Sequence, residues 1–290
     1  MRSVLYSAAI VLAALATSVA DCAAQPAPRV NYAAMNKLGW KLSCQAWTFR
    51  ELTLFETIDT LKSLGIRYIE MFPGQRVSKD EPVAFNENAP AGAIDQVIEK
   101  CRAAGVTPVC YGVTGIPADE AGARKVFDFA KKLGLLNLVA EPAENQFDMI
   151  DKLCNEYKIN VAIHDHPKPS HYWDPDTVLK VCEGRSLRIG SCADTGHWRR
   201  SGLDPVECLR KLKGRIISLH FKDLDAKNDD VPWGTGVCNA AGQLEELKKQ
   251  GFKGVFSIEY ERTSGQELID NVRKCVVWFS AECSRLAKSR

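Results

Sequence analysis

Residues 160–166 read NVAIHDH, residues 188–197 read RIGSCADTGH, residues 216–223 read IISLHFKD, and residues 254–261 read GVFSIEYE. Each segment is a short apolar run that ends in charged or imidazole side chains. Runs of this length, bounded by turn residues, are typical of buried strands. Extending the pattern outward gives eight predicted strands: 41–46, 68–71, 107–112, 137–140, 160–164, 188–193, 216–221 and 254–258.

Amphipathic segments separate the predicted strands. Leu54, Ile58, Leu61 and Leu64 follow the spacing of a helix that faces a core, and the segments 94–101 and 126–133 repeat it. Glycines fall where such helices would end, at Gly65, Gly105, Gly134 and Gly251. Eight strand–helix units in about 250 residues favour an α/β fold, a single (β/α)8 TIM barrel with its helices outside a parallel sheet.

An open, doubly wound parallel sheet is the alternative fold. Such a sheet usually carries a glycine-rich phosphate-binding loop after its first strand. Here the first strand ends in residues 44–47, which read CQAW and contain no glycine. The sequence therefore favours the closed barrel.

The N-terminal segment is typical of a secretory signal peptide. Arg2 precedes a mostly apolar run over residues 4–16, and residues 18–20 (SVA) form a small-x-small cleavage motif. The run is shorter than the ~20 residues that span a membrane. Asp21 disfavours a lipid anchor at Cys22, an alternative that the sequence leaves open. We therefore predict export to the periplasm or the medium, with a signal peptide over 1–20, a flexible lead-in over 21–37 and one TIM-barrel catalytic domain over 38–290.

The composition indicates neither a nucleic-acid partner nor a membrane partner. The chain has 38 basic and 36 acidic residues, a formal net charge of +2, which is not the charge imbalance typical of proteins that bind nucleic acid or membrane surfaces. The 11 cysteines form an odd count without a C-x-x-C pair. We interpret most of them as small buried hydrophobic residues, while one or two disulfides stay open for an exported protein.

Carboxylates and imidazoles gather at the ends of the later strands, where barrel enzymes place their catalytic groups. All 5 histidines lie between residues 164 and 220. Glu141, Asp194, His220 and Glu259 end four different strands, and a barrel would aim them at one point. This oxygen-rich set suits Mn²⁺, Mg²⁺ or Co²⁺, with Zn²⁺ as an alternative, and without a cation its carboxylates would repel one another. Taken singly, each has an ordinary explanation; Asp194, for example, has the position of a turn former.

Other side chains near the strand ends are candidates for binding a substrate. Lys222 would either neutralise a developing enolate or pair with Asp223. Trp47 would either stack on the face of a sugar or be buried. Because side chains alternate along a strand, only one of His164 and His166 would face the barrel mouth. We take His166 as the substrate-binding candidate of the two.

Four motifs resemble a known family: IHDHP (163–167), DTGH (194–197), HFKD (220–223) and IEYE (258–261). They are similar to the sugar phosphate isomerase/epimerase group of the xylose-isomerase-like TIM-barrel superfamily, and the resemblance covers about residues 38–280. It implies a divalent metal held by Glu141, Asp194, His220 and Glu259. It also implies that His197 lies near substrate oxygens, and it leaves a homo-oligomer open, since relatives often form one.

The reaction that the resemblance implies is a sugar isomerisation or epimerisation. A proton would leave the carbon beside a carbonyl, and the metal would stabilise the resulting enediolate. Glu141 and Glu259 would remove and return the proton, a contribution of roughly 10²–10⁴-fold. Asp165 departs from the Asn that related proteins often have there, so the role of its loop stays open.

Two alternatives to this function remain open, and a third is disfavoured. A lyase or hydratase acting on a 3-keto-glycoside would use the same metal site, because an enediolate can expel a neighbouring substituent. A non-catalytic sugar-binding module would keep the fold without the reaction. Zinc-dependent apurinic-site nucleases share the superfamily fold, but they need histidines from early strands, and this chain has none before His164.

Overall fold

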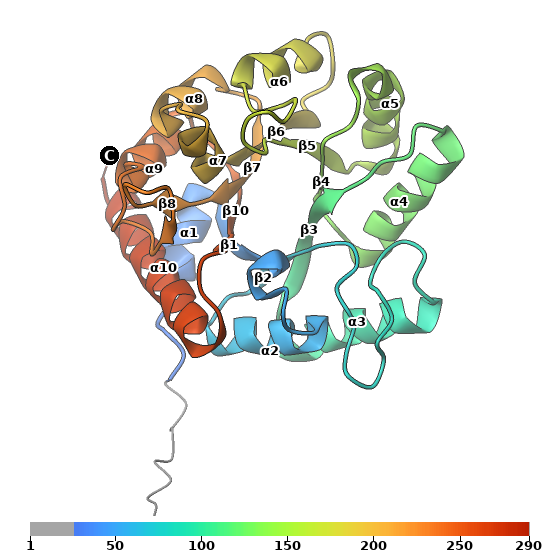
Figure 1. The fold of residues 1–290 in the computed structure, drawn as a ribbon, viewed down its shortest axis with the longest axis horizontal. Helices are drawn as coiled ribbons and strands as arrows, with labels where there is room; N and C mark the ends of the chain where they lie inside the picture. Colours follow the sequence, from blue (N-terminus) through green and yellow to red (C-terminus); the bar gives the residue numbers. More distant parts are fainter. Residues whose placement is uncertain (1–25, 290) are drawn as a thin grey trace, which may run out of the picture.

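Eight parallel strands close into a barrel in this computed structural model, which describes residues 26–289 (Figure 1). Around the barrel the strands follow the order β1, β10, β7, β6, β5, β4, β3, β2, and the pairing of β1 with β10 closes it. The strands are β1 (Trp40–Gln45), β2 (Tyr68–Met71), β3 (Thr107–Thr114), β4 (Asn137–Ala140), β5 (Asn160–His164), β6 (Ile189–Asp194), β7 (Ile216–Phe221) and β10 (Gly254–Ile258). The predicted TIM barrel is confirmed, whereas the predicted signal peptide and Cys22 lie outside the described residues.

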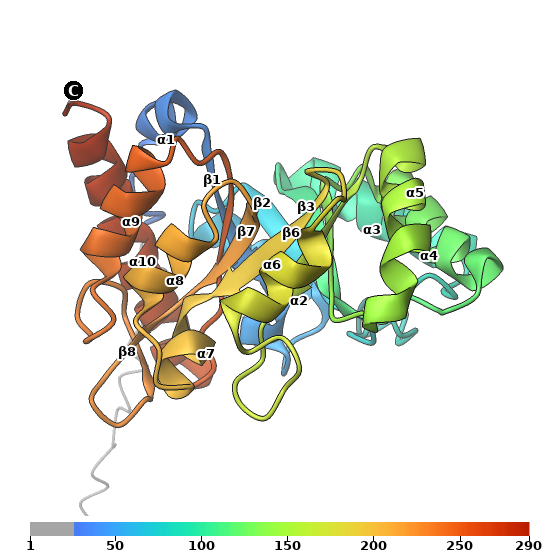
Figure 2. The ribbon, with the colours of Figure 1, turned by 90° about the horizontal axis from the view of Figure 1, so that it is seen from above.

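Helices surround the sheet, and Figure 2 shows them on the outer side of the strands. They are α1 (Tyr32–Leu38), α2 (Leu54–Ser63), α3 (Ala91–Ala104), α4 (Glu120–Leu133), α5 (Phe147–Tyr157), α6 (Pro175–Cys182), α7 (Thr195–Arg200), α8 (Pro205–Lys211), α9 (Ala240–Lys249) and α10 (Gly265–Leu286), with the 3-10 helices η1 (Ala46–Phe49) and η2 (Glu144–Gln146). Gly105 and Gly134 end α3 and α4 in the left-handed conformation, both at φ 70°. The sequence predicted helix ends at these two glycines.

Two hydrophobic clusters lie on the two sides of the sheet. The larger one joins the outer face of the strands to the helices, for example Leu42 of β1 with Val276 of α10. The smaller one contains strand residues only, and we place it in the barrel interior: Val109, Cys110, Val139, Ala162, Cys192 and Val255. Because small side chains fill the interior, the strand ends are left to carry the polar groups. A short antiparallel pair, β8 (Asp223–Leu224) and β9 (Asp230–Val231), follows β7.

The lead-in predicted to be flexible over 21–37 is wrong for its last part, because residues 32–38 form α1. Asn31 caps this helix by accepting a hydrogen bond from the backbone of Ala34. The backbone N–H of Asn31 also donates to Ser280 of α10 at 2.8 Å. Ala34 and Met35 are buried, so the packing of α1 fixes the segment before the barrel begins.

The cysteines agree with their interpretation as buried hydrophobic residues. Within residues 26–289 there are ten cysteines, and all are buried and unpaired. In the same part of the chain, no helix is both long and apolar enough to cross a membrane.

Candidate active site

A cavity of about 490 Å³ opens at the carboxyl-terminal ends of the barrel strands. Side chains from the first three strands and their loops make its apolar wall, including Trp47, Phe72 and Val113. The opposite wall is polar and comes from the later strands: His164, His166, His197, Glu259 and Glu261. The cavity therefore offers one face for the carbon skeleton of a ligand and one for its oxygens.

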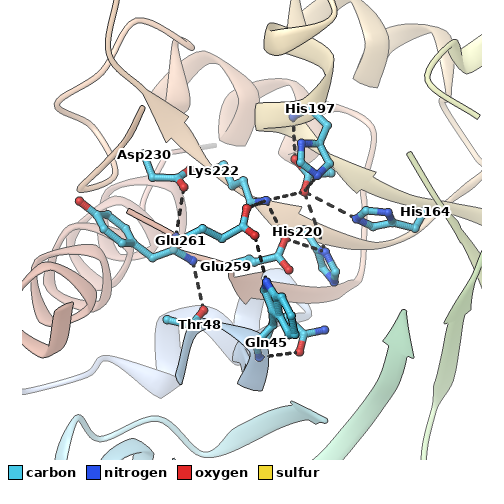
Figure 3. A network of polar contacts seen from close by, with 12 residues as sticks. Gln45, Thr48, His164, His197, His220, Lys222, Asp230, Glu259 and Glu261 are labelled. Carbon is cyan, nitrogen blue, oxygen red and sulfur yellow. Dashed lines mark hydrogen bonds and ion pairs between the residues drawn. The ribbon is translucent and has the colours of Figure 1, made fainter. Parts of the chain in front are cut away.

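Four buried side chains converge beneath the polar wall. His164, Asp194, His220 and Glu259 each offer one ligand atom, and these atoms lie within 4.8 Å of one another. Figure 3 shows His164, His220 and Glu259 directed toward a common region. Nδ1 of His220 lies 3.1 Å from Oε2 of Glu259, and Nε2 of His164 lies 3.7 Å from Oδ2 of Asp194.

The free atoms of this cluster fit a divalent metal ion. Nε2 of His164, Nδ1 of His220 and Oδ2 of Asp194 are buried, and none makes a hydrogen bond of acceptable geometry. Buried polar atoms are almost always paired. Here Oδ2 of Asp194 has an ion-pair contact with Nζ of Lys222 at 3.0 Å, and Nδ1 of His220 has one with Oε2 of Glu259 at 3.1 Å, so a divalent ion is a further partner that the three atoms could share. Two imidazoles and two carboxylates form a mixed nitrogen and oxygen set, which Mn²⁺, Co²⁺ and Zn²⁺ all accept.

The structure brings three of the four predicted metal ligands into one buried cluster. Asp194, His220 and Glu259 come together as predicted, but His164 takes the place predicted for Glu141. Oε1 of Glu141 instead lies 3.0 Å from Nδ1 of His164 and contacts the ring of His166. Glu141 thus lies behind His164 and orients it, because a proton on Nδ1 leaves the lone pair of Nε2 for the cluster.

The surroundings of Glu141 keep its carboxylate ionised. Burial alone would raise its pKa, but hydrogen bonds from His164 and His166 outweigh this effect and hold the pKa well below its ordinary value. The hydroxyl of Ser170 donates to Oε2 of Glu141 at 3.1 Å. Glu141 also belongs to a second group of potential metal ligands, with His164 and His166, so its predicted role as a ligand stays a prediction.

Asp194 serves the fold with one oxygen and faces the cluster with the other. Oδ1 accepts a hydrogen bond of 2.7 Å from the backbone of His197 and caps α7. Oδ2 faces the cluster. Position 196 must be small, because a Cβ on Gly196 would lie 2.8 Å from the side chain of Lys222. The helix-capping and metal-binding readings of Asp194 are therefore compatible.

Lys222 is buried among three carboxylates. Its Nζ lies 3.0 Å from Oδ2 of Asp194, 2.7 Å from Oε2 of Glu259 and 2.9 Å from Oε2 of Glu261. Burial alone would lower its pKa, but these carboxylates outweigh burial and raise the pKa well above the ordinary value. The alternative pairing with Asp223 is not seen, since that carboxylate accepts backbone N–H groups, for example of Gly234 and Cys238.

Glu70 stands out in the sequence as the only charged residue at the ends of the first three strands, but its role was not predicted. Glu70 is buried, and its Oε1 accepts a hydrogen bond of 2.8 Å from Nε2 of His220. The hydroxyl of Ser257 donates to its other oxygen at 2.5 Å. With Nε2 of His220 held by Glu70, Nδ1 is the nitrogen left for the cluster.

The predicted substrate-binding residues reach the site in different ways. His166, His197 and Trp47 all line the cavity, and Lys222 acts on it through its contacts with Glu259 and Glu261. Burial lowers the pKa of His197 to about 3, so its ring is neutral near pH 7. The prediction that only one of His164 and His166 faces the barrel mouth is wrong, because both line the cavity. β5 ends at His164, so the alternation of side chains along a strand does not extend to His166.

Asp165 stands where the sequence resemblance led us to expect Asn, and its side chain contacts the backbone at the end of β6. It is buried, and its Oδ1 accepts a hydrogen bond of 2.8 Å from the backbone of Asp194. Burial and the charge of Asp194 raise the pKa of Asp165 well above its ordinary value.

Comparison with known proteins gives matches to both sequence and fold. A family model described as a xylose isomerase-like TIM barrel matches residues 58–279. An uncharacterised protein from Parabacteroides distasonis is 36% identical, with a TM-score of 0.69 over 83% of this chain and 98% of that chain. A D-tagatose 3-epimerase-like protein shares the fold at 17% identity, with a TM-score of 0.65 over 83% of this chain and 98% of that chain.

Further matches differ in how much of each protein they cover. The 3-keto-D-glucoside 4-epimerase of E. coli shares the fold at 11% identity, with a TM-score of 0.64 over 83% of this chain and 99% of that chain. The chain spans less than half the length of the curated relatives that it matches, 45% and 42%, at 29% and 28% identity.

The family match begins within α2 and ends within α10. It therefore includes every strand that carries a residue of the His164, Asp194, His220 and Glu259 cluster. The sequence resemblance and the structure agree, and the chain belongs to the xylose isomerase-like TIM barrel family.

Proposed function

We propose that this chain is a divalent-metal-dependent enzyme that removes a proton beside the carbonyl of a sugar or sugar-derived ketone, as an isomerase or epimerase. The observation that carries the proposal is the convergence of His164, Asp194, His220 and Glu259 below one cavity. Solved structures with the same fold include a D-tagatose 3-epimerase-like protein. Export through the predicted signal peptide remains part of the proposal.

The donor set suggests which metals the site prefers. His164, Asp194, His220 and Glu259 would hold the ion through two nitrogens and two oxygens. Because Mg²⁺ favours oxygen ligands, we expect Mn²⁺, Co²⁺ or Zn²⁺ in this site. A bound divalent ion supplies a Lewis acid that polarises a carbonyl and stabilises the negative charge that develops on it.

Glu259 is the best-placed group to accept the carbon-bound proton. It is the carboxylate of the cluster that lines the cavity. Burial alone would raise its pKa, but Lys222 and His220 outweigh burial and keep the pKa well below the ordinary value. Glu259 is therefore ionised and has a lone pair for the proton, but the contacts with Lys222 and His220 that lower its pKa also make it a weaker base than an ordinary glutamate; Lys222 beside it offsets negative charge on the substrate.

His166 and Glu141 supply the second proton-transfer position. The ring of His166 is exposed to the cavity, and the carboxylate of Glu141 contacts its Nδ1. A carboxylate behind an imidazole orients the ring and stabilises its protonated form. In this arrangement Glu141 acts through His166, and His197, neutral and also in the cavity wall, donates a hydrogen bond to a substrate oxygen.

The test replaces each glutamate by glutamine and follows hydrogen exchange of D-fructose in heavy water by NMR. We expect Glu259→Gln and Glu141→Gln each to slow exchange by roughly 10²–10⁴-fold, the usual contribution of a general acid or base. Metal content is measured on the same samples, so that a lost ligand is distinguished from a lost base. Glu144→Gln is the matched control, because Glu144 pairs with Lys180 outside the cavity. Unchanged exchange in both glutamine variants would contradict the assignment.

A lyase or hydratase acting on a 3-keto-glycoside is the second candidate. The apolar cavity wall formed by Trp47, Phe72 and Val113 leaves room for a group attached to the sugar. After proton removal, the same electron pair could expel that group instead of taking a proton back. Mass spectrometry of the product separates the two reactions, because an epimer keeps the mass of the substrate and an elimination releases a fragment. A protein that binds sugar but shows neither product would support the binding-module alternative.

A further inference from the structure

A second cavity lies beside the first, and the two share Trp47 and Phe72. The outer cavity measures about 360 Å³ and is lined by Trp47, Arg50, Leu52, Phe72, Gly74, Gln75 and Arg76. The inner cavity of about 490 Å³ contains Glu259 and the histidines. Trp47 is 41% exposed and borders both cavities.

Trp47 is fixed by three different neighbours. Its Nε1 donates a hydrogen bond of 3.1 Å to Oε1 of Glu261. The ring of Phe72 packs edge-on against it, with 5.2 Å between ring centroids and 85° between planes. The guanidinium of Arg50 lies 5.4 Å from the indole centroid. An exposed indole held this firmly loses little conformational entropy when it binds a ring, which is what a preformed stacking surface requires.

Trp47 is also connected to the proposed reaction centre. The carboxylate of Glu261 bridges from the indole to Nζ of Lys222, which it contacts at 2.9 Å. Lys222 in turn contacts Glu259 at 2.7 Å. Trp47 and Glu259 therefore line the same inner cavity and are joined by one chain of contacts, and Trp47 also borders the outer cavity, where a ring attached to the first could lie.

The rim of the outer cavity offers hydrogen-bond donors. Arg50 and Arg76 both line it and are both exposed. The guanidinium of Arg50 donates to the backbone carbonyls of Trp47 and Glu261, at 3.3 and 3.5 Å, which holds it in place beside the indole. Guanidinium groups beside an aromatic ring are well suited to the hydroxyl and carboxylate oxygens of a sugar.

We propose that the natural substrate has at least two rings, with the ketone-bearing ring in the inner cavity and a second sugar ring over Trp47 in the outer cavity. Oxygens of the second ring accept hydrogen bonds from Arg50 and Arg76. The inner cavity alone falls within the ~300–1,000 Å³ of sites that enclose drug-sized ligands, and the outer cavity extends it. This inference rests on the proposed function and names its substrate class as a glycoside instead of a free monosaccharide.

The experiment compares ligands of one and two rings on the Mn²⁺-loaded protein by calorimetry. D-fructose is the one-ring probe, and lactulose, turanose, leucrose and isomaltulose are ketose disaccharides that attach the second ring at different positions. We expect at least one disaccharide to bind about tenfold more tightly than fructose, the advantage that one stacked ring provides. Trp47→Ala and Arg76→Ala should each reduce this ratio, whereas Arg102→Ala, whose guanidinium pairs with Glu99 on α3, should leave it unchanged.

The two proposals fail in different ways. If fructose binds as tightly as every disaccharide, or if Trp47→Ala weakens fructose and disaccharides equally, the two-ring substrate is overturned while the reaction at Glu259 stands. If no ketose binds and none exchanges hydrogen in heavy water, the proposed function fails, and the two-ring substrate fails with it. Arg76→Ala gives a second reading that does not depend on the packing of Trp47 against Phe72.

Discussion

At the level of single residues, three of the four members of the candidate metal cluster use one atom for the fold and another for the site. Asp194 caps α7 with Oδ1 and faces the cluster with Oδ2. His164 is held at Nδ1 by Glu141, and His220 is held at Nε2 by Glu70. The free atoms therefore point into the cluster before any ion arrives, which lowers the ordering cost of binding.

Glu70 makes the clearest prediction at this scale. In Glu70→Gln the hydrogen bond to His220 can persist, but the negative charge that makes His220 a stronger ligand is lost. We expect the affinity for Co²⁺ to fall by about 10–100-fold, the usual effect of changing a group that orients a ligand. Competition with a chelator measures the affinity, and the visible spectrum of bound Co²⁺ reports on ligand geometry, which a purely structural role would not alter.

Glu99→Gln is the control for Glu70→Gln, because Glu99 is exposed on α3 and pairs with Arg102. It should change neither the affinity nor the spectrum. If Glu70→Gln binds Co²⁺ as tightly as the wild type with the same spectrum, Glu70 has no orienting role.

The sequence could predict most of the site but not the choice between Glu141 and His164. Asp194, His220 and Glu259 were recognisable because each directly ends or follows an apolar strand. Ala140 of β4 pairs with Ile163 of β5, so Glu141 and His164 both lie one step beyond the same level of the barrel. β4 already ends at Ala140, and the direction of a side chain beyond a strand end is set by tertiary contacts, which spacing does not encode.

At the level of elements, strand positions were predictable because each strand is a short apolar run between polar turns. β2, β4, β5, β7 and β10 have the predicted bounds, whereas β3 continues beyond the predicted end at Gly112 to Thr114. In the sequence, Gly112 suggests the end of a strand. In the structure it lets β3 approach β4 closely, because a Cβ there would lie 2.3 Å from the carbonyl oxygen of Val139. The sequence alone does not distinguish a glycine required for close strand packing from a glycine that ends a strand, because the distinction depends on the position of the neighbouring strand.

The start of α2 makes a prediction about pH. Thr53 and Glu56 form a capping box, and Lys79 pairs with Glu56. Lys79 first, then Thr53, lowers the pKa of Glu56 from 4.5 to about 2. A lowered carboxyl pKa stabilises the fold above the unfolded value, and this stabilisation is lost as the pH falls from about 4.5 through about 2. Urea unfolding between pH 6 and pH 3 should therefore show a smaller loss of unfolding free energy in Glu56→Gln than in the wild type.

Glu51→Gln is the matched control for the pH prediction, because Glu51 is exposed just before α2 and is not part of the capping box. Its loss of unfolding free energy with falling pH should follow that of the wild type. An equal loss in the wild type and in Glu56→Gln would show that the capping box contributes nothing to acid sensitivity.

At the level of the whole molecule, contacts that join the first and last strands also position part of the candidate site. Figure 1 shows the first and last helices, α1 and α10, side by side where the barrel closes. The hydroxyl of Thr48, just after β1, donates to the carbonyl of Ile258 at 3.3 Å and accepts from the backbone of Tyr260 at 3.1 Å. These bonds flank Glu259, so the position of the proposed base depends on the junction between the first and last strands.

This coupling predicts that a bound metal stabilises the entire chain and that Lys222 partly substitutes for it. Lys222→Met removes the cation from between Asp194 and Glu259, and breaking a buried ion pair costs about 3–5 kcal/mol. An ion at 100 times its dissociation constant adds about 2.7 kcal/mol to the unfolding free energy. Because that ion also neutralises Asp194 and Glu259, the variant should lose more stability with a chelator present than with saturating Mn²⁺.

Urea unfolding of the wild type and of Lys222→Met, each with chelator and with Mn²⁺, measures this difference directly. Lys152→Met is the control, since Lys152 is exposed and pairs with Glu120 far from the cavity; it should cost little, and equally, in both conditions. If Lys222→Met loses the same free energy with and without Mn²⁺, then the ion and the lysine do not act on the same carboxylates. The cluster of His164, Asp194, His220 and Glu259 would then not be where the ion binds, because no ion held there could leave the charges beside Lys222 unchanged.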